Sequence, residues 1–133
     1  MKKIEHIGIA VSDLNESNKI YSQILGLDPY KKEIVESEGV ITSFFQTKNT
    51  KIELLQGVSK DNAISKFIEK RGQGIHHIAF EVKNIYEEIK RLKKLGFTII
   101  NETPKKGADN KLICFIHPKS TNHVLIELCQ KIK

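Results

Sequence analysis

The stretch Ile4-Glu5-His6-Ile7-Gly8-Ile9-Ala10-Val11 returns in the second half of the chain as Ile75-His76-His77-Ile78-Ala79-Phe80-Glu81-Val82. In both copies apolar residues alternate with polar or small ones, which is the pattern of a strand with one buried face. Each copy is followed by a side chain that can begin a helix and, three residues on, by a glutamate: Asp13 with Glu16, and Asn84 with Glu87. The sequence therefore predicts the same strand and helix start twice.

The rest of the chain continues the duplication. Gly26 and Gly96 each end a predicted helix, and Ile-Glu-Leu occurs with its glutamate at Glu53 and again at Glu127, at nearly the same offset as the two strand copies. Further strands are expected near residues 40–46, 51–55, 97–101, 112–117 and 123–129, with a loop at 103–110 and a short helix near 63–68.

This order predicts an α+β fold of two tandem βαβββ modules, whose strands form a curved mixed sheet around a metal-binding cleft. We expect one domain over residues 1–133, with module one at about 1–56, a linker helix at about 57–73 and module two at about 74–133.

Size and composition exclude several classes of protein. The chain has 133 residues, of which 39% are apolar and 29% charged, as expected for one globular domain. No apolar run is long enough to cross a membrane, and no leader peptide is evident, so a cytoplasmic location is expected. The two cysteines, Cys114 and Cys129, lie in apolar runs and are predicted to be buried free thiols.

The net charge of +6 lies wholly in the second half of the chain. Residues 1–66 hold 9 basic and 9 acidic residues, whereas residues 67–133 hold 13 (22 − 9) and 7 (16 − 9). This excess of positive charge in one half of the chain indicates either binding of a phosphate-bearing ligand or a solvated lysine-rich surface. The lysines are dispersed and no nucleic-acid motif is present, so no nucleic-acid partner is expected.

Four polar residues are predicted to share one face of the sheet. Strand alternation puts His6, Glu53, His77 and Glu127 on the face opposite the apolar residues that pack against the helices. Two imidazoles and two carboxylates suit a divalent ion such as cobalt, manganese, nickel, zinc or iron. A single His or Glu in a strand is usually structural, but the matched pairs favour a metal site. His76 is expected to be structural because it points to the opposite face from His77, and His117 and His123 because they have no partner in the repeat.

The residues also resemble a known family, the methylmalonyl-CoA epimerases of the vicinal-oxygen-chelate (glyoxalase-like) superfamily. The resemblance covers essentially the whole chain and rests on four stretches: His6-Ile7-Gly8-Ile9-Ala10-Val11, Ile52-Glu53-Leu54-Leu55, Gly74-Ile75-His76-His77-Ile78-Ala79-Phe80-Glu81-Val82, and His117-Pro118-Lys119 with Val124-Leu125-Ile126-Glu127-Leu128.

The resemblance implies a metal-dependent isomerase. It implies one divalent ion on His6, Glu53, His77 and Glu127, a CoA thioester substrate, and a homodimer. The implied reaction is epimerisation of methylmalonyl-CoA through a metal-stabilised enolate, with Glu127 as both ligand and base. Thr42 stands where some relatives have a second glutamate, and His123 stands where many have glycine.

Other residues are weaker candidates for substrate contacts. Thr42 is a candidate through its position, and Lys119 is expected to contact the CoA phosphates, with Lys105 or Lys106 next. Three alternatives stay open. A glyoxalase I-type isomerase of a glutathione hemithioacetal is disfavoured by His117-Pro118-Lys119, and an extradiol dioxygenase by chain length. A metal-free drug-binding resistance module is disfavoured by the four matched ligands.

Overall fold

The computed structural model describes residues 2–133 and confirms the predicted α+β fold of two βαβββ modules. The elements in chain order are β1 (Lys3–Ala10), α1 (Leu14–Leu25), β2 (Lys31–Val35), β3 (Val40–Gln46), β4 (Lys51–Gly57), α2 (Ala63–Arg71), β5 (Gly74–Glu81), α3 (Ile85–Lys94), β6 (Lys105–Lys106), β7 (Lys111–Ile116), the 3-10 helix η1 (Pro118–Ser120) and β8 (Ile126–Lys131). Two compact units divide these elements: an N-terminal unit, His6–His76, and a C-terminal unit, which combines the segment ending at Glu5 with His77–Lys133.

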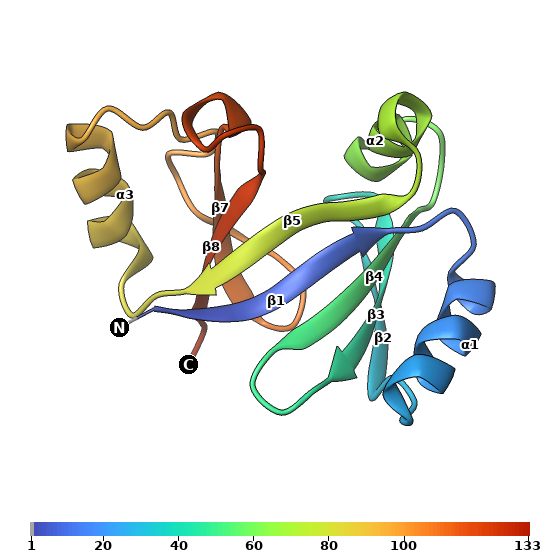
Figure 1. Ribbon diagram of the computed structural model, residues 1–133. Coiled ribbons are helices and arrows are strands. Elements are labelled where there is room, and N and C mark those ends of the chain that lie inside the picture. Colours follow the sequence, from blue (N-terminus) through green and yellow to red (C-terminus); the bar gives the residue numbers. More distant parts are fainter. Residues whose placement is uncertain (1) are drawn as a thin grey trace. The chain divides into compact units, whose positions relative to one another are not determined.

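In the N-terminal unit the strands are hydrogen-bonded in the order β2-β3-β4-β1. β1 runs parallel to β4, and the other neighbours are antiparallel. Helix α1 lies beside this sheet (Figure 1). Its buried Leu14 packs with Val11, Phe45 and Leu54, while Ile9, Ile41, Ile52, Tyr21 and Leu25 surround this cluster. Burial of such apolar side chains supplies the main stabilisation of the unit.

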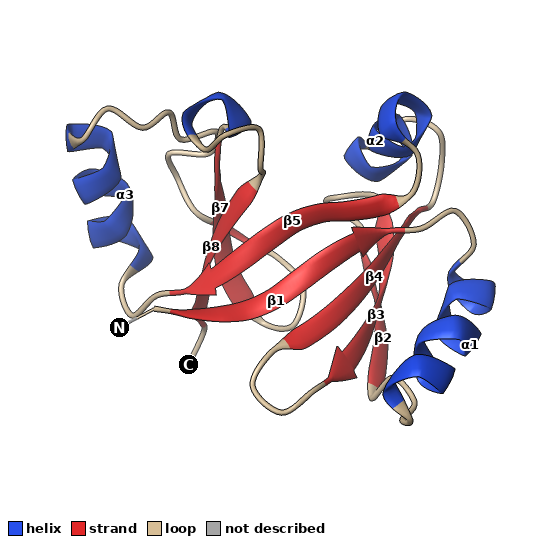
Figure 2. Cartoon of the chain, viewed as in Figure 1, coloured by secondary structure: helices blue, strands red, loops and turns tan. Residues whose placement is uncertain are grey.

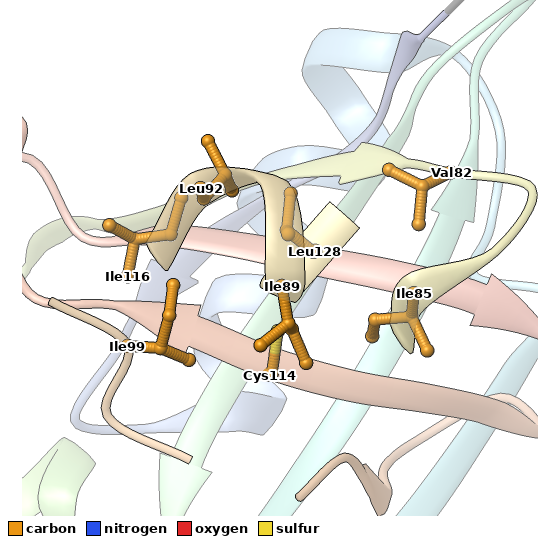
Figure 3. Close-up of a cluster of buried hydrophobic side chains, with 8 residues drawn as sticks. All are labelled: Val82, Ile85, Ile89, Leu92, Ile99, Cys114, Ile116 and Leu128. Atoms are coloured by element: carbon orange, nitrogen blue, oxygen red, sulfur yellow. The ribbon is translucent and has the colours of Figure 1, made fainter. Parts of the chain in front are cut away.

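The C-terminal unit repeats this plan with the strand order β5-β8-β7-β6. β5 runs parallel to β8, and β7 is antiparallel to both β8 and β6. Helix α3 stands beside β7 and β8 (Figure 2). Figure 3 shows the core that joins helix to strands: Val82, Ile85, Ile89, Leu92, Ile99, Cys114, Ile116 and Leu128. The apolar residues at Ile85, Ile89 and Leu92 have helical spacing, so one stripe of α3 faces the sheet.

Both helices begin with the same pair of caps. The Asp13 side chain accepts from the Glu16 backbone N–H at 3.1 Å, and Asn84 accepts from Glu87 at 3.2 Å, as the sequence predicts. A second cap comes from the last strand of each module. The Oε1 atom of Gln56 accepts from the N–H of Leu14 at 2.6 Å, and that of Gln130 from Ile85 at 2.7 Å. The two glutamines are separated by the same offset as Glu53 and Glu127.

The predicted strand at residues 97–101 is wrong. Ile99 forms only an isolated bridge to Ile116, and the edge strand is β6, inside the stretch predicted as a loop. Gly96 has a φ of 95°, in the left-handed region, so the chain turns sharply as it leaves α3. Phe97 and Ile99 then pack against the core of α3. The apolar residues at 97–101 therefore pack beside α3 and do not form a strand of the sheet.

The sequence prediction differs from the structure at two further strands, β2 and β8. β2 was not located from the sequence, although the module pattern requires a strand there. The last strand begins at Ile126 and not at His123, because η1 and two residues with left-handed backbone, Asn122 and His123, precede it. His123 has a φ of 66°, a conformation that glycine adopts at less cost, which explains why glycine suits this position.

No helix among residues 2–133 has the length and apolar character needed to cross a bilayer.

Candidate functional site

The N-terminal unit buries one histidine and one glutamate side by side. His6 lies on β1 and Glu53 on the parallel neighbour β4, where Glu53 stands opposite Gly8. The His6 Nδ1 atom is 3.1 Å from Glu53 Oε2, and the two residues are 5% and 4% exposed. Two ionisable side chains that are buried together must compensate each other or bind a charged group, because unpaired burial is costly.

The C-terminal unit buries the same pair at the equivalent places. His77 lies on β5 and Glu127 on the parallel neighbour β8, where Glu127 stands opposite Ala79. The His77 Nε2 atom is 3.2 Å from Glu127 Oε1, and each residue is 5% exposed. The duplication inferred from the sequence therefore extends to the contact between the two side chains.

The surroundings of the two pairs are duplicated as well. Gly8 and Ala79, which occupy equivalent places in the two strand copies, leave space beside each glutamate. On the other side, Phe44 is directly opposite Glu53 and Phe115 is directly opposite Glu127. The Phe115 ring meets His77 edge-on, with centroids 6.0 Å apart. Each pair thus has a small residue and an aromatic ring as neighbours, which is a further match between the modules.

The donor atoms of each pair have the separation of neighbouring metal ligands. With metal–ligand bonds of about 2.1 Å, two ligands at a right angle lie roughly 3 Å apart. The observed separations of 3.1 and 3.2 Å agree with this value. Imidazole and carboxylate are the ligands that divalent transition ions accept together. The buried His/Glu pairs are therefore compatible with a metal site.

Both cysteines are buried, and burial disfavours the ionised form of their thiols. Burial raises the pKa of the Cys114 thiol to about 12, with the Glu127 carboxylate acting in the same direction. Burial also raises the pKa of Cys129, with Glu127 and Glu5 acting in the same direction and Lys111 against them. Both thiols are therefore protonated at neutral pH, and the prediction of buried free thiols is confirmed.

Thr42 and Lys119, the predicted substrate contacts, differ in their surroundings. Thr42 is fully buried on β3, and its hydroxyl has no hydrogen-bond partner among residues 2–133. It lies two residues from Phe44, hence on the same face of the sheet as Glu53. Lys119 is exposed in η1, where its backbone N–H donates to His117 Nδ1 at 3.0 Å. Lys105 and Lys106 form the edge strand β6.

The remaining histidines have structural surroundings. His76 packs edge-on against Phe67, with ring centroids 5.0 Å apart. Burial lowers its pKa to about 4, so this imidazole is neutral at pH 7. His117 caps η1, and the backbone N–H of His123 donates to the Pro118 carbonyl at 2.8 Å.

Lys111 is a buried polar residue that sequence reasoning missed. It begins β7 and is 5% exposed, whereas the predicted strand starts at Leu112 and the predicted loop ends at residue 110, so that Lys111 belongs to neither. A lysine at a strand end is usually solvated, so its residue type gave no signal. The one indication in the sequence is the spacing of four residues between Lys111 and Phe115, which places both on the same face if they lie in one strand.

Known proteins resemble this chain over most of its length. The profile of the Glyoxalase/Bleomycin resistance protein/Dioxygenase superfamily matches residues 5–115. The uncharacterized protein YqjC of Bacillus subtilis is 39% identical over 98% of this chain and 93% of its own. A mitochondrial methylmalonyl-CoA epimerase of Dictyostelium discoideum is 41% identical over 97% of this chain and 78% of its own.

Solved structures extend the likeness to three dimensions. A hypothetical protein from Bacillus halodurans C-125 superposes with a TM-score of 0.96 and 42% identity, over 99% of this chain and 96% of its own. Methylmalonyl-CoA epimerase from Mycobacterium tuberculosis gives 0.93 and 32%, over 98% and 88%. A methylmalonyl-CoA epimerase in complex with methylmalonyl-CoA and NH4+ gives 0.92 and 28%, over 98% and 95%. The chain therefore belongs to the glyoxalase/bleomycin resistance protein/dioxygenase superfamily, the vicinal-oxygen-chelate group that its motifs resemble.

Proposed function

We propose that the protein is a metal-dependent epimerase of methylmalonyl-CoA. The observation that carries the proposal is the buried His/Glu pair, which occurs twice at matched strand positions. The relatives named as methylmalonyl-CoA epimerases support the substrate, since one of them is 41% identical over 97% of the chain. The solved epimerase complex with methylmalonyl-CoA supports a CoA thioester as the bound partner.

In this proposal His6, Glu53, His77 and Glu127 hold one divalent ion, and residues 1–133 act as a single domain because both modules supply ligands. A bound divalent ion supplies a Lewis acid that stabilises negative charge on substrate oxygens. Cobalt, manganese, nickel and zinc all suit these donors.

Glu127 is proposed to move the proton. Its carboxylate accepts the α-proton, and the electron pair of the broken C–H bond spreads toward the thioester and carboxylate oxygens of the substrate. A solvent-derived proton delivered to the opposite face of the same carbon by a group other than Glu127 gives the other epimer, and Glu127 releases its proton to solvent. Cys129 and Phe115, on the same face of the sheet, reduce the access of water around this carboxylate.

The weaker substrate contacts fit the same proposal. The hydroxyl of Thr42 is buried without a hydrogen-bond partner among the described residues, which suits a polar atom supplied by the substrate. Lys119 is exposed in the half of the chain that carries the excess positive charge, which suits the phosphates of CoA. The implied homodimer remains a proposal from the resemblance alone.

The test is exchange of the α-proton of methylmalonyl-CoA in deuterated water, followed by mass spectrometry. The protein loaded with a divalent ion is expected to incorporate one deuterium and to interconvert the epimers. The same protein given a glutathione hemithioacetal is expected to be inactive. Turnover of the hemithioacetal without exchange of methylmalonyl-CoA would contradict the proposal and favour a glyoxalase activity.

A further inference from the structure

Lys111 belongs to a very small set of residues. Among residues 2–133 it is the one lysine or arginine that is buried. The other buried side chains that carry or can take a charge, thiols aside, are the two His/Glu pairs and Glu5. Burial of a charged group needs a compensating reason, which is structural pairing or function. Besides the two His/Glu pairs, the described residues therefore bury one further ionic pair, Glu5 with Lys111.

The position of Lys111 connects it with the candidate site in two ways. On β7, Lys111 and Phe115 are four residues apart and share a face, and Phe115 is directly opposite Glu127. The ammonium also faces Glu5, with 3.8 Å between Lys111 Nζ and Glu5 Oε2. Glu5 immediately precedes His6 in the chain. Within the C-terminal unit, the ammonium is thus beside Glu5, and Lys111 shares the face of the sheet on which Glu127 lies.

The ammonium is held by charge and not by close hydrogen bonds. Its distances to Glu5 Oε2 and Asp109 Oδ2 are 3.8 and 4.0 Å, and both exceed the length of an N–H···O hydrogen bond. Glu5 and Asp109 also have other partners, so neither carboxylate depends on Lys111 alone. An ammonium in this state can take a closer carboxylate ligand as a charge-assisted hydrogen bond.

We propose that Lys111 binds the free carboxylate of the substrate and so selects acyl-CoA thioesters that carry an α-carboxylate. The inference rests on the proposed function and adds a specificity residue to it. The charges are consistent with this role. Among the buried residues, the Glu53 and Glu127 carboxylates balance a divalent ion and Glu5 balances Lys111, while Asp109, the other carboxylate near the ammonium, is partly exposed to solvent. A neutral acyl group offers the ammonium only a carbonyl oxygen, which makes a weaker hydrogen bond than a carboxylate does.

The test compares two substrates that differ in this one group. Methylmalonyl-CoA carries the carboxylate, and 2-methylacetoacetyl-CoA carries a neutral acetyl group in its place while keeping two carbonyl oxygens and an acidic α-proton. Exchange of the α-proton is measured for both, after subtraction of the spontaneous rate. We expect Lys111→Met to lower kcat/KM for methylmalonyl-CoA at least tenfold and to leave the neutral substrate nearly unchanged.

Lys131→Met is the matched control. Lys131 stands directly opposite Lys111 in the β7–β8 register, but its side chain is 71% exposed. In this variant the ratio of kcat/KM for methylmalonyl-CoA to kcat/KM for the neutral substrate is expected to equal that of the wild type. If Lys111→Met fails to fold, the double change Glu5→Gln with Lys111→Met removes both buried charges together and is measured in the same way.

The outcomes separate the two proposals. Exchange of methylmalonyl-CoA by the wild type establishes the proposed function before any variant is read. The specificity role is supported if kcat/KM for methylmalonyl-CoA, divided by kcat/KM for the neutral substrate, falls tenfold in Lys111→Met or in the double variant. Equal losses on both substrates, or no loss on either, would overturn that role and leave the epimerase proposal standing. A wild type without exchange would overturn the epimerase proposal itself.

Discussion

Replacing Glu127 by Gln keeps the size of the side chain but removes its negative charge and its ability to take a proton. We expect α-proton exchange to fall by more than the roughly 10²–10⁴-fold that is typical of a lost general base, because a candidate ligand is perturbed as well. The measurement is the exchange rate with the bound ion quantified in the same sample. Glu102→Gln is the control, since that side chain is 61% exposed and pairs with Lys93. Near-normal exchange in Glu127→Gln with the ion bound would place the base elsewhere.

His123 offers a prediction about stability. Its φ of 66° lies in the left-handed region, which costs a non-glycine residue roughly 1–2 kcal/mol. Glycine removes this cost but loses more entropy on folding, about 0.4–1 kcal/mol. We expect His123→Gly to raise the free energy of unfolding by about 0.5–1 kcal/mol, measured by urea denaturation.

Asn122→Gly is the control for His123→Gly. Asn122 has a φ of 58°, but asparagine tolerates this conformation better, so the gain is expected to be smaller. A loss of stability in His123→Gly would show that the imidazole makes a stabilising contact that outweighs the backbone strain.

At the scale of elements, the two strand glutamines are predicted to stabilise the two helices equally. Gln56 and Gln130 each accept the first backbone N–H of a helix, at 2.6 and 2.7 Å. Loss of such a cap costs typically about 1 kcal/mol. We expect Gln56→Ala and Gln130→Ala each to lower the free energy of unfolding by about that amount, and the exposed Gln23→Ala to change it by less than about 0.5 kcal/mol. A large effect from one cap and none from the other would contradict their equivalence.

The loop at η1 is the element where the CoA phosphates are proposed to dock. Lys119→Ala is expected to raise KM for methylmalonyl-CoA severalfold, and the effect should weaken as salt rises, because screening reduces the attraction of an exposed lysine. A truncated thioester without the nucleotide should show no change. Lys60→Ala, an exposed lysine in the half of the chain with balanced charge, is the control. Equal losses on both thioesters would leave Lys119 as ordinary surface.

Sequence patterns predicted the elements that repeat and missed those that depend on packing. The helix caps at Asp13 and Asn84 and the strand at Val40–Gln46 are confirmed, because capping and alternation are local properties. The strand at residues 97–101 is wrong, since Phe97 and Ile99 fill space under α3 and leave β6 as the edge. Whether an apolar run pairs or packs is decided by its neighbours in space, which one sequence does not show.

The same limit applies to the candidate site. The two His/Glu pairs could be found because each half supplies a copy against which the other is checked. Lys111 has no such copy, and its buried partner Glu5 is distant in sequence. Residues without a counterpart in the repeat, Thr42 among them, become candidates only through their burial and their neighbours.

For the whole molecule, we predict that one ion needs both His/Glu pairs. Each pair alone offers two ligands, fewer than the three or four protein ligands of a typical transition-ion site. The direct measurement is the metal content of protein that has been loaded with a divalent ion, desalted and analysed by mass spectrometry. Three variants are compared with the wild type: His6→Ala, His77→Ala, and His117→Ala as the exposed control.

We predict one ion per chain in the wild type and in His117→Ala, and its loss in both His6→Ala and His77→Ala, while circular dichroism shows that all four proteins are folded. Two ions per chain in the wild type, or an ion retained with wild-type affinity after either His6 or His77 is replaced, would contradict a single site built from both pairs.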